Sequence, residues 1–309
     1  MPPRRPAQPR ALRFRLAAVT AALTVLAAAG CTSSSSSGPR DGGAEREASS
    51  REPEAGEPSW DTSPSSLAAL GDSITTGFDT CRVLADCPEA SWATGTDAGV
   101  DSLAMRLLGD ETAVTERAWN YAEAGATVSG LAAQAREAMA HDPDLVTVLI
   151  GANDACAPDV TEMTSVAEFE RGFTRALDEI RAADESTQVY VSSVPDLMRL
   201  WEEGSGSAMA ALIWEAADIC PSVLADPGNR GERAVQRREA VRERIEEYNA
   251  VLAQVCGADP LCRYDDGAVF SYPFTTDHLS GWDWFHPSEE GQRELARLAY
   301  ERVTRDGGG

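Results

Sequence analysis

Two short apolar runs, each ended by a glycine and followed at once by polar residues, constrain the fold of this chain most. The first run is Leu67–Leu70 before Gly71, and the second is 144–150 before Gly151. Runs of this length are typical of strands buried on both faces, and helix-patterned segments follow them. We therefore predict an α/β fold, a three-layer α/β/α sandwich with a central, mostly parallel sheet. Because ligands bind beyond the carboxyl ends of such strands, the residues after Gly71 and Gly151 should lie at a site.

The remaining elements follow from apolar spacing, caps and breakers. We predict helices at 101–108, 127–140, 166–183, 208–220, 234–254 and 288–303, and further strands at 119–122, 188–194 and 263–270. Residues 77–99 should form a loop over the site, stiffened by a disulfide.

The N-terminal region has the pattern of an export signal. The first 30 residues hold five arginines and no acidic residue, and the apolar stretch that follows the arginines is too short for an ordinary transmembrane helix. Ala28–Cys31 is similar to a lipobox, in which Cys31 would be lipidated, although Ala28 stands where leucine is usual. Ordinary secretion, a retained anchor and an incidental cysteine are the alternatives. We expect a protein on the outer face of the membrane or secreted.

These features give three predicted parts of the chain. Residues 1–30 are a signal peptide, 31–64 a disordered tether rich in Ser, Gly, Pro, Glu and Arg, and 65–306 one domain. The formal charge is −23, and it becomes −28 without the five arginines of the first 30 residues. So acidic a surface argues against nucleic acid as a partner and allows membrane contact only through a lipid anchor. The chain has no lysine, which excludes Ser-Lys dyads and Schiff-base chemistry.

Six cysteines remain once Cys31 is set aside, an even number that suits an oxidising compartment. Six cysteines allow fifteen pairings. Two pairs would close short loops and the third follows by elimination: Cys81 with Cys87, Cys256 with Cys262, and Cys156 with Cys220. Buried free thiols are the alternative. We predict no metal site, because the chain has no C-x-x-C pair and only three histidines, His141, His278 and His286.

Four short blocks carry the chemistry. They are Gly71-Asp72-Ser73-Ile74, Gly125, Gly151-Ala152-Asn153-Asp154 and Asp283-Trp284-Phe285-His286-Pro287. Together they contain a hydroxyl nucleophile, an imidazole base with a nearby carboxylate, and N–H groups for an oxyanion, which are the parts that acyl transfer needs. Their order resembles that of the SGNH hydrolases, also called the GDSL esterase and lipase family, whose fold is flavodoxin-like.

The resemblance implies a role for each residue. Ser73 would be the nucleophile, His286 the base and Asp283 its orienting carboxylate, while Ser73 N–H, Gly125 N–H and the Asn153 amide would form the oxyanion hole. In the Gly125 block Ala124 replaces the usual serine, but the donor is a main-chain group. The plainer alternatives are a helix cap for Ser73 and Asn153, and a turn for Gly125 and Asp283.

The predicted function is a serine esterase that hydrolyses short-chain acyl or O-acetyl esters through an acyl-enzyme, without a cofactor. A lipase or phospholipase, a non-enzymatic envelope-binding lipoprotein, and acyl transfer to an acceptor other than water are the alternatives. The expected substrate is a small ester, a lipid or an O-acylated glycan, and we expect a monomer.

Overall fold

The structure, a computed structural model, describes residues 59–306. The predicted signal peptide, Cys31 and most of the predicted tether lie outside these residues. The last part of the tether lies inside them, and there Trp60 packs against the domain: its indole nitrogen donates to the carbonyl oxygen of Val303 at 2.8 Å. Arg263 stacks over its ring, with the guanidinium carbon 4.2 Å from the ring centroid. The end of the segment predicted as a disordered tether therefore packs on the domain at Trp60.

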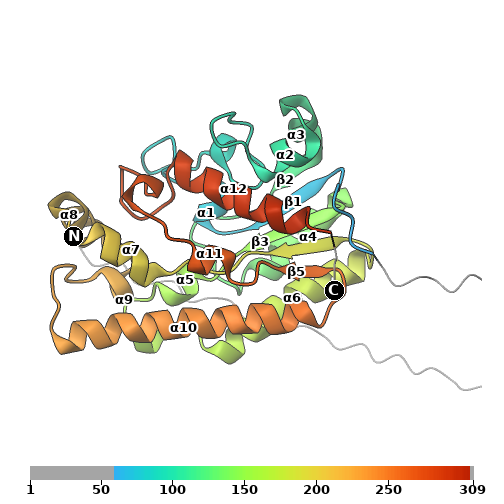
Figure 1. The fold of residues 1–309 in the computed structure, drawn as a ribbon. Coiled ribbons are helices and arrows are strands. Elements are labelled where there is room, and N and C mark those ends of the chain that lie inside the picture. The colour runs from blue at the N-terminus through green and yellow to red at the C-terminus, as the bar shows by residue number, and fades with distance from the viewer. Residues whose placement is uncertain (1–58, 307–309) are drawn as a thin grey trace, which may run out of the picture. The chain divides into compact units, whose positions relative to one another are not determined.

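A five-stranded parallel sheet forms the centre of the domain, as predicted (Figure 1). Its strands are β1 Leu67–Gly71, β2 Ala118–Asn120, β3 Leu145–Leu149, β4 Gln188–Val191 and β5 Cys262–Tyr264. The strand order is β2-β1-β3-β4-β5, so β1 has a neighbour on each side. All five residues of β1 and of β3 are buried, which explains why both strands are continuous apolar runs.

Helices cover both faces of the sheet and complete the predicted three layers (Figure 1). The helices against one face are α4 Leu131–Ala138, α6 Val166–Ala183 and α10 Glu232–Gly257. Those against the other are α2 Leu103–Leu108, α3 Glu111–Arg117 and α12 Glu289–Val303. The remaining helices are α1 Ser73–Thr76, α5 Ala152–Ala155, α7 Leu197–Gly204, α8 Ala208–Ala217, α9 Pro221–Leu224 and α11 Ala268–Ser271. The 3-10 turns are η1 Pro88–Ala90, η2 Met139–His141, η3 Val160–Glu162 and η4 Thr276–His278.

The predicted strand at 263–270 is wrong beyond Tyr264. Asp265 accepts hydrogen bonds from the N–H groups of Gly267 and Val269, and Gly267 has a φ of 76°. A residue in that left-handed region ends the strand, and α11 follows. Helix α7 was not predicted, although Asp196 caps it by accepting from Met198 N–H and Arg199 N–H.

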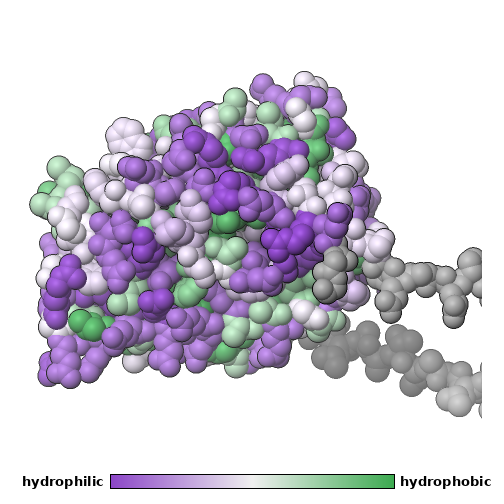
Figure 2. Space-filling view, viewed as in Figure 1, coloured by the Kyte–Doolittle hydropathy of each residue, from purple (hydrophilic) through white to green (hydrophobic). Residues whose placement is uncertain are grey.

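All three predicted disulfides are formed: Cys81–Cys87, Cys156–Cys220 and Cys256–Cys262. The face seen in Figure 2 is mostly hydrophilic, with hydrophobic residues in small separate areas, in keeping with the acidic composition. Within residues 59–306, no helix has the length and apolar character needed to cross a membrane.

Candidate active site

The turn after β1 is fixed by close packing around Gly71. Its φ is 153°, and a Cβ there would lie 2.4 Å from the carbonyl oxygen of Leu149 on β3. The buried amide of Gln134 accepts from Gly71 N–H and donates to Gly71 C=O, at 2.9 and 3.0 Å. Asp72, not Ser73, is the cap of α1, because its side chain accepts from Ile74 N–H at 3.0 Å. The side chain of Ser73 is therefore left free to take part in the site.

Asp72, the residue after Gly71, has a fully buried carboxyl group. One of its oxygens accepts from Ile74 N–H, and the other has no hydrogen-bond partner within residues 59–306. Burial raises the pKa of Asp72 to about 7, because desolvation disfavours the carboxylate. The carboxyl group of Asp72 therefore holds its proton more tightly than an ordinary aspartate does.

Ser73, His286 and Asp283 form one hydrogen-bonded chain. Ser73 Oγ lies 2.9 Å from His286 Nε2, and His286 Nδ1 lies 2.5 Å from Asp283 Oδ2. All three side chains are largely buried, and the His286 ring packs against Phe78 and Phe285 with centroids 4.9 and 5.0 Å apart. Burial alone would raise the pKa of Asp283, but the hydrogen bonds from His286 and from the backbone outweigh burial and lower it. The arrangement can therefore move a proton from the serine hydroxyl to an imidazole that a carboxylate orients.

The segment 276–287 that holds His286 and Asp283 is irregular and is fixed by individual hydrogen bonds. Asp283 Oδ1 accepts from the N–H groups of Phe285 and His286, at 2.8 and 3.0 Å. From α8, the buried indole of Trp214 donates to the carbonyl oxygens of Asp283 and Trp284, at 3.1 and 3.3 Å. Ser280 N–H donates to His286 C=O at 2.7 Å. These bonds orient the carboxylate toward the imidazole without help from the sheet.

The candidate oxyanion donors come from the segments that follow three neighbouring strands, with Ser73 in α1 and Asn153 in α5. Ser73 N–H and Gly125 N–H have no acceptor within the described part of the chain. Asn153 Nδ2 donates to Ala126 C=O at 2.9 Å, which brings the loop after β3 against the one that carries Gly125. Asn153 does not cap α5, whose cap is Gly151. Its second amide N–H is left for another acceptor.

A hollow of about 740 Å³, part of it open to solvent, lies against Ser73, Asn153 and His286. Gly125 is not among its lining residues. Its other walls are mainly apolar side chains from α7, residues 274–287 and α12, among them Leu197, Leu200, Phe274, Leu279, Phe285 and Leu295. Three charged residues, Asp196, Arg199 and Glu203, also line it. Phe285 thus lines the hollow as well as packing on His286, whereas Trp282 is exposed.

The other two histidines lie apart from the hydrogen-bonded chain. His278 lines the hollow, and its Nδ1 accepts from Thr275 N–H at 3.0 Å. His141 stacks on Trp119, with ring centroids 4.3 Å apart, and is exposed. Asp154 has the structural role expected of it, since it accepts from Val128 N–H at 3.0 Å. Burial raises its pKa.

Sequence reasoning missed several residues that position the site. Gln134 and Gln292 are buried amides whose bonds reach Gly71 and Ile74, and Trp214 holds the Asp283 segment. Asp79 lies in the predicted loop 77–99, and nothing in the sequence indicated that its carboxyl lies beside Asp283 and His286. A polar residue on an otherwise apolar helix face was the only available signal for Gln134.

Two groups of side chains within residues 59–306 have ligand types that metals use. In the first, Cys81 and Cys87 are joined in a disulfide and so offer no thiolate beside Glu89. The second is Asp79 with Asp283 and His286, where the imidazole nitrogen that faces Asp283 is already hydrogen-bonded to it.

Comparison with known proteins gives a family and three distant structural likenesses. The model of the GDSL-like lipase/acylhydrolase family matches residues 69–294. A search of curated proteins found no significant match. Among solved structures, the chain is similar to a family 3 carbohydrate esterase from Clostridium thermocellum (16% identity, TM-score 0.45, covering 77% of this chain and 94% of that one). It is also similar to an extracellular lipase from Streptomyces rimosus, with 18% identity and a TM-score of 0.45, covering 78% of this chain and 100% of that one. A third similar structure is phospholipase A1 from Streptomyces albidoflavus NA297, with 17% identity and a TM-score of 0.46, covering 78% of this chain and 100% of that one.

Proposed function

Since the chain belongs to the GDSL-like lipase/acylhydrolase family and is a carboxylic ester hydrolase, we propose that Ser73, His286 and Asp283 are its catalytic triad. The observation that carries the proposal is the continuous chain of hydrogen bonds from Ser73 Oγ through the imidazole to Asp283. The distance from Ser73 Oγ to His286 Nε2, 2.9 Å, is within the range that proton transfer needs, and the 2.5 Å contact with Asp283 orients the imidazole.

The proposed reaction has two steps. Ser73 Oγ attacks the ester carbonyl carbon while His286 Nε2 takes the hydroxyl proton, and the tetrahedral intermediate collapses as His286 returns that proton to the departing alkoxide. Water then attacks the acyl-enzyme with the same imidazole as base, which releases the acid and restores Ser73. Asp283 stays ionised, fixes the tautomer of His286 and stabilises the imidazolium.

The oxyanion of each tetrahedral intermediate would be held by Ser73 N–H, Gly125 N–H and the Asn153 amide. The absence of an acceptor for the two main-chain groups within residues 59–306, and the position of Asn153 at the hollow, support this assignment. Such a donor typically contributes about 3 kcal/mol to stabilisation of the transition state.

The substrate we propose is an ester with a short acyl or acetyl group. The apolar walls of the hollow favour a second candidate, a lipid acyl ester, because a chain of several methylenes would bury apolar surface there. An O-acylated glycan would place hydroxyl groups against these apolar walls, and only the polar lining residues, such as Arg199 and Glu203, could bond to them.

We further propose that the enzyme works outside the cytoplasm. Its three disulfides support this, because disulfides persist in oxidising compartments. Attachment through a lipid on Cys31 remains part of the proposal, and labelling with a radioactive fatty acid in wild type and in Cys31→Ala would test it.

The decisive experiment is hydrolysis of p-nitrophenyl esters from acetate to palmitate by the oxidised protein, with Ser73→Ala beside it. We expect turnover by wild type and a loss of about 10⁴-fold or more in the variant. A maximum at acetate or butyrate would support the short-ester proposal, and one at longer chains the lipid candidate. Activity that survives Ser73→Ala in a folded protein would overturn the triad.

A further inference from the structure

A second carboxyl group, Asp79, lies against the proposed triad. One oxygen of Asp79, one oxygen of Asp283 and one ring nitrogen of His286 all lie within 4.8 Å of one another. Asp79 is 1% exposed, so water does not screen it from Asp283. Two buried carboxylates at this distance repel each other strongly, and one of them is therefore expected to hold a proton.

The hydrogen bonds already present leave room for that proton at one place. Asp283 Oδ1 accepts two backbone N–H groups, which fill both of its lone pairs, whereas Asp283 Oδ2 accepts only from His286 Nδ1. Asp79 Oδ1 accepts from Leu84 N–H, so its other oxygen is the one available to carry a proton. A donor on Asp79 Oδ2 and a free lone pair on Asp283 Oδ2 are complementary.

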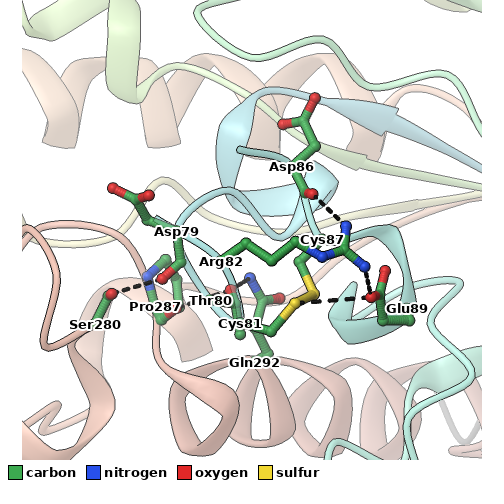
Figure 3. Close-up of a disulfide and its surroundings, with 10 residues drawn as sticks. All are labelled: Asp79, Thr80, Cys81, Arg82, Asp86, Cys87, Glu89, Ser280, Pro287 and Gln292. Carbon is green, nitrogen blue, oxygen red and sulfur yellow. Dashed lines mark hydrogen bonds and ion pairs between the residues drawn. A yellow bond between two sulfur atoms is a disulfide. The ribbon is translucent and has the colours of Figure 1, made fainter. Parts of the chain in front are cut away.

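The backbone of Asp79 is fixed from both of its sides. Ser280 Oγ donates to Asp79 C=O at 2.6 Å (Figure 3). Asp79 N–H donates to Ala85 C=O at 3.1 Å. Its φ is 55°, a left-handed conformation that the loop of the Cys81–Cys87 disulfide maintains. The carboxyl group is thus held beside Asp283 by contacts that do not depend on its own charge.

From this geometry we propose that Asp79 is a positioning residue, whose protonated carboxyl donates a hydrogen bond to Asp283 Oδ2 and so holds that carboxylate toward His286. The inference rests on the proposed triad. It assigns the disulfide loop a part in the site beyond covering it. The direction of the pKa shift agrees, since burial and the neighbouring Asp283 carboxylate raise the pKa of Asp79.

Within residues 59–306 no arginine forms an ion pair with Asp79, and His286 is the one group beside it that can become a cation. Arg82 is the nearest arginine along the chain, and its guanidinium points away from Asp79 and donates to Asp86 C=O and to Glu89 (Figure 3). Segment 276–287 contains four titratable side chains, and of these Asp283 and His286 lie beside Asp79; the other two are Asp277 and His278. The charged groups of the disulfide loop are Arg82, Asp86 and Glu89.

The test is the pH profile of kcat/KM for p-nitrophenyl ester hydrolysis by wild type and Asp79→Asn. Asparagine keeps an N–H donor but has no charge to lose. If Asp79 is protonated, the midpoint of the acid limb stays where it is and kcat/KM remains within about fivefold of wild type. If Asp79 is instead a carboxylate, the substitution removes a negative charge next to His286 and lowers the midpoint by about one pH unit or more, which would overturn the proposal.

Asp79→Ala supplies the complementary result. Loss of the donor to a charged acceptor should lower kcat/KM by about tenfold to a hundredfold, and Asp79→Asn should restore most of it. Equal loss in both variants, or no loss in either, contradicts a positioning role. If Asp79→Ala does not fold, the Asp79→Asn profile decides alone. Asp277→Asn, an exposed carboxyl in the segment that carries Asp283, whose side chain makes no hydrogen bond within residues 59–306, is the control and should leave the profile unchanged.

An NMR titration of the imidazoles separates this inference from the proposed function. The chain has three histidines, so the signals of His286 can be assigned with a His286→Gln control. The midpoint for His286 in protein without substrate should be the same in wild type and Asp79→Asn. If wild type hydrolyses no ester, the proposed function fails, while this titration still accepts or rejects the protonated Asp79.

Discussion

The two halves of the candidate active site are held in place in different ways. Ser73 follows β1, a fully buried strand with a neighbour on each side, and the turn between them is closely packed. His286 and Asp283 lie in an irregular segment outside the sheet, whose shape depends on single bonds from side chains such as Trp214. The position of Ser73 should therefore be sensitive to backbone changes, and the positions of His286 and Asp283 to the loss of individual polar side chains.

Asp283→Asn should have the largest effect on kcat/KM, and it tests the half of the site that individual side chains hold in place. The amide would place an N–H donor where Oδ2 now accepts from His286 Nδ1, which favours the wrong tautomer of the imidazole. We expect kcat/KM to fall by about 10³- to 10⁴-fold with little change in folding. Asp277→Asn, an exposed position in the same segment, is the control. Less than a tenfold loss in Asp283→Asn would mean that the carboxylate does not orient the base.

Gly71→Ala tests the backbone half. A Cβ at this position would meet Leu149 C=O at 2.4 Å and Thr75 Oγ1 at 2.7 Å, so the free energy of unfolding should fall by about 3 kcal/mol or more. The matched change in the base segment is Gly281→Ala, where a Cβ meets no atom within 4 Å, and its effect should stay within about 0.5 kcal/mol. Urea unfolding of both variants measures the two free-energy changes. Similar changes in the two variants would contradict the prediction.

Asp72→Asn sharpens the comparison by its dependence on pH. The pKa of Asp72 is about 7 in the folded protein against 3.8 for an ordinary aspartate, so the folded state holds its proton more tightly than the unfolded state does. The stability that this proton contributes is complete below about pH 4 and is lost as the pH rises to about 7. Between pH 5 and 8, wild type should lose about 2–3 kcal/mol relative to Asp72→Asn in urea unfolding. A difference that does not change with pH would contradict this.

Trp214→Phe should give the smallest effect. It removes the N–H that bonds the carbonyl oxygens of Asp283 and Trp284, and kcat/KM should fall by about three- to tenfold. Trp201→Phe removes an equally buried indole bond, to Pro227 C=O, away from the base segment. We expect it to cost similar stability while kcat/KM is unchanged. An equal loss of kcat/KM in both variants would show that the Trp214 bonds act only through overall stability.

The same division explains what the sequence could and could not predict. The strand ends at Gly71 and Gly151 are local signals, because an apolar run and a glycine lie side by side in the sequence. The layers and the disulfide pairs followed from such signals. The predicted strand at 263–270 failed because one carboxyl group, Asp265, bonds two backbone N–H groups and turns the chain into α11.

Contacts between distant segments could not be predicted. Asp79 and Asp283 are far apart in the sequence, as are Trp214 and the carbonyl groups it bonds. Neither Asp79 nor Trp214 belongs to a spacing pattern, since a carboxyl in a loop and an aromatic residue on a helix have many ordinary uses. Their roles depend on tertiary packing, which also determines whether Gln134 reaches Gly71.

The strand order has a consequence for how substrate preference can change. The segments that carry the three proposed oxyanion donors follow β2, β1 and β3, which are adjacent strands about 4.8 Å apart. The strand order therefore brings these segments to neighbouring positions at one edge of the sheet. Helix α7 lies outside the sheet and supplies Leu197 and Leu200 to that hollow, so substitutions at these two residues should change substrate preference without moving the strands that precede the proposed donors.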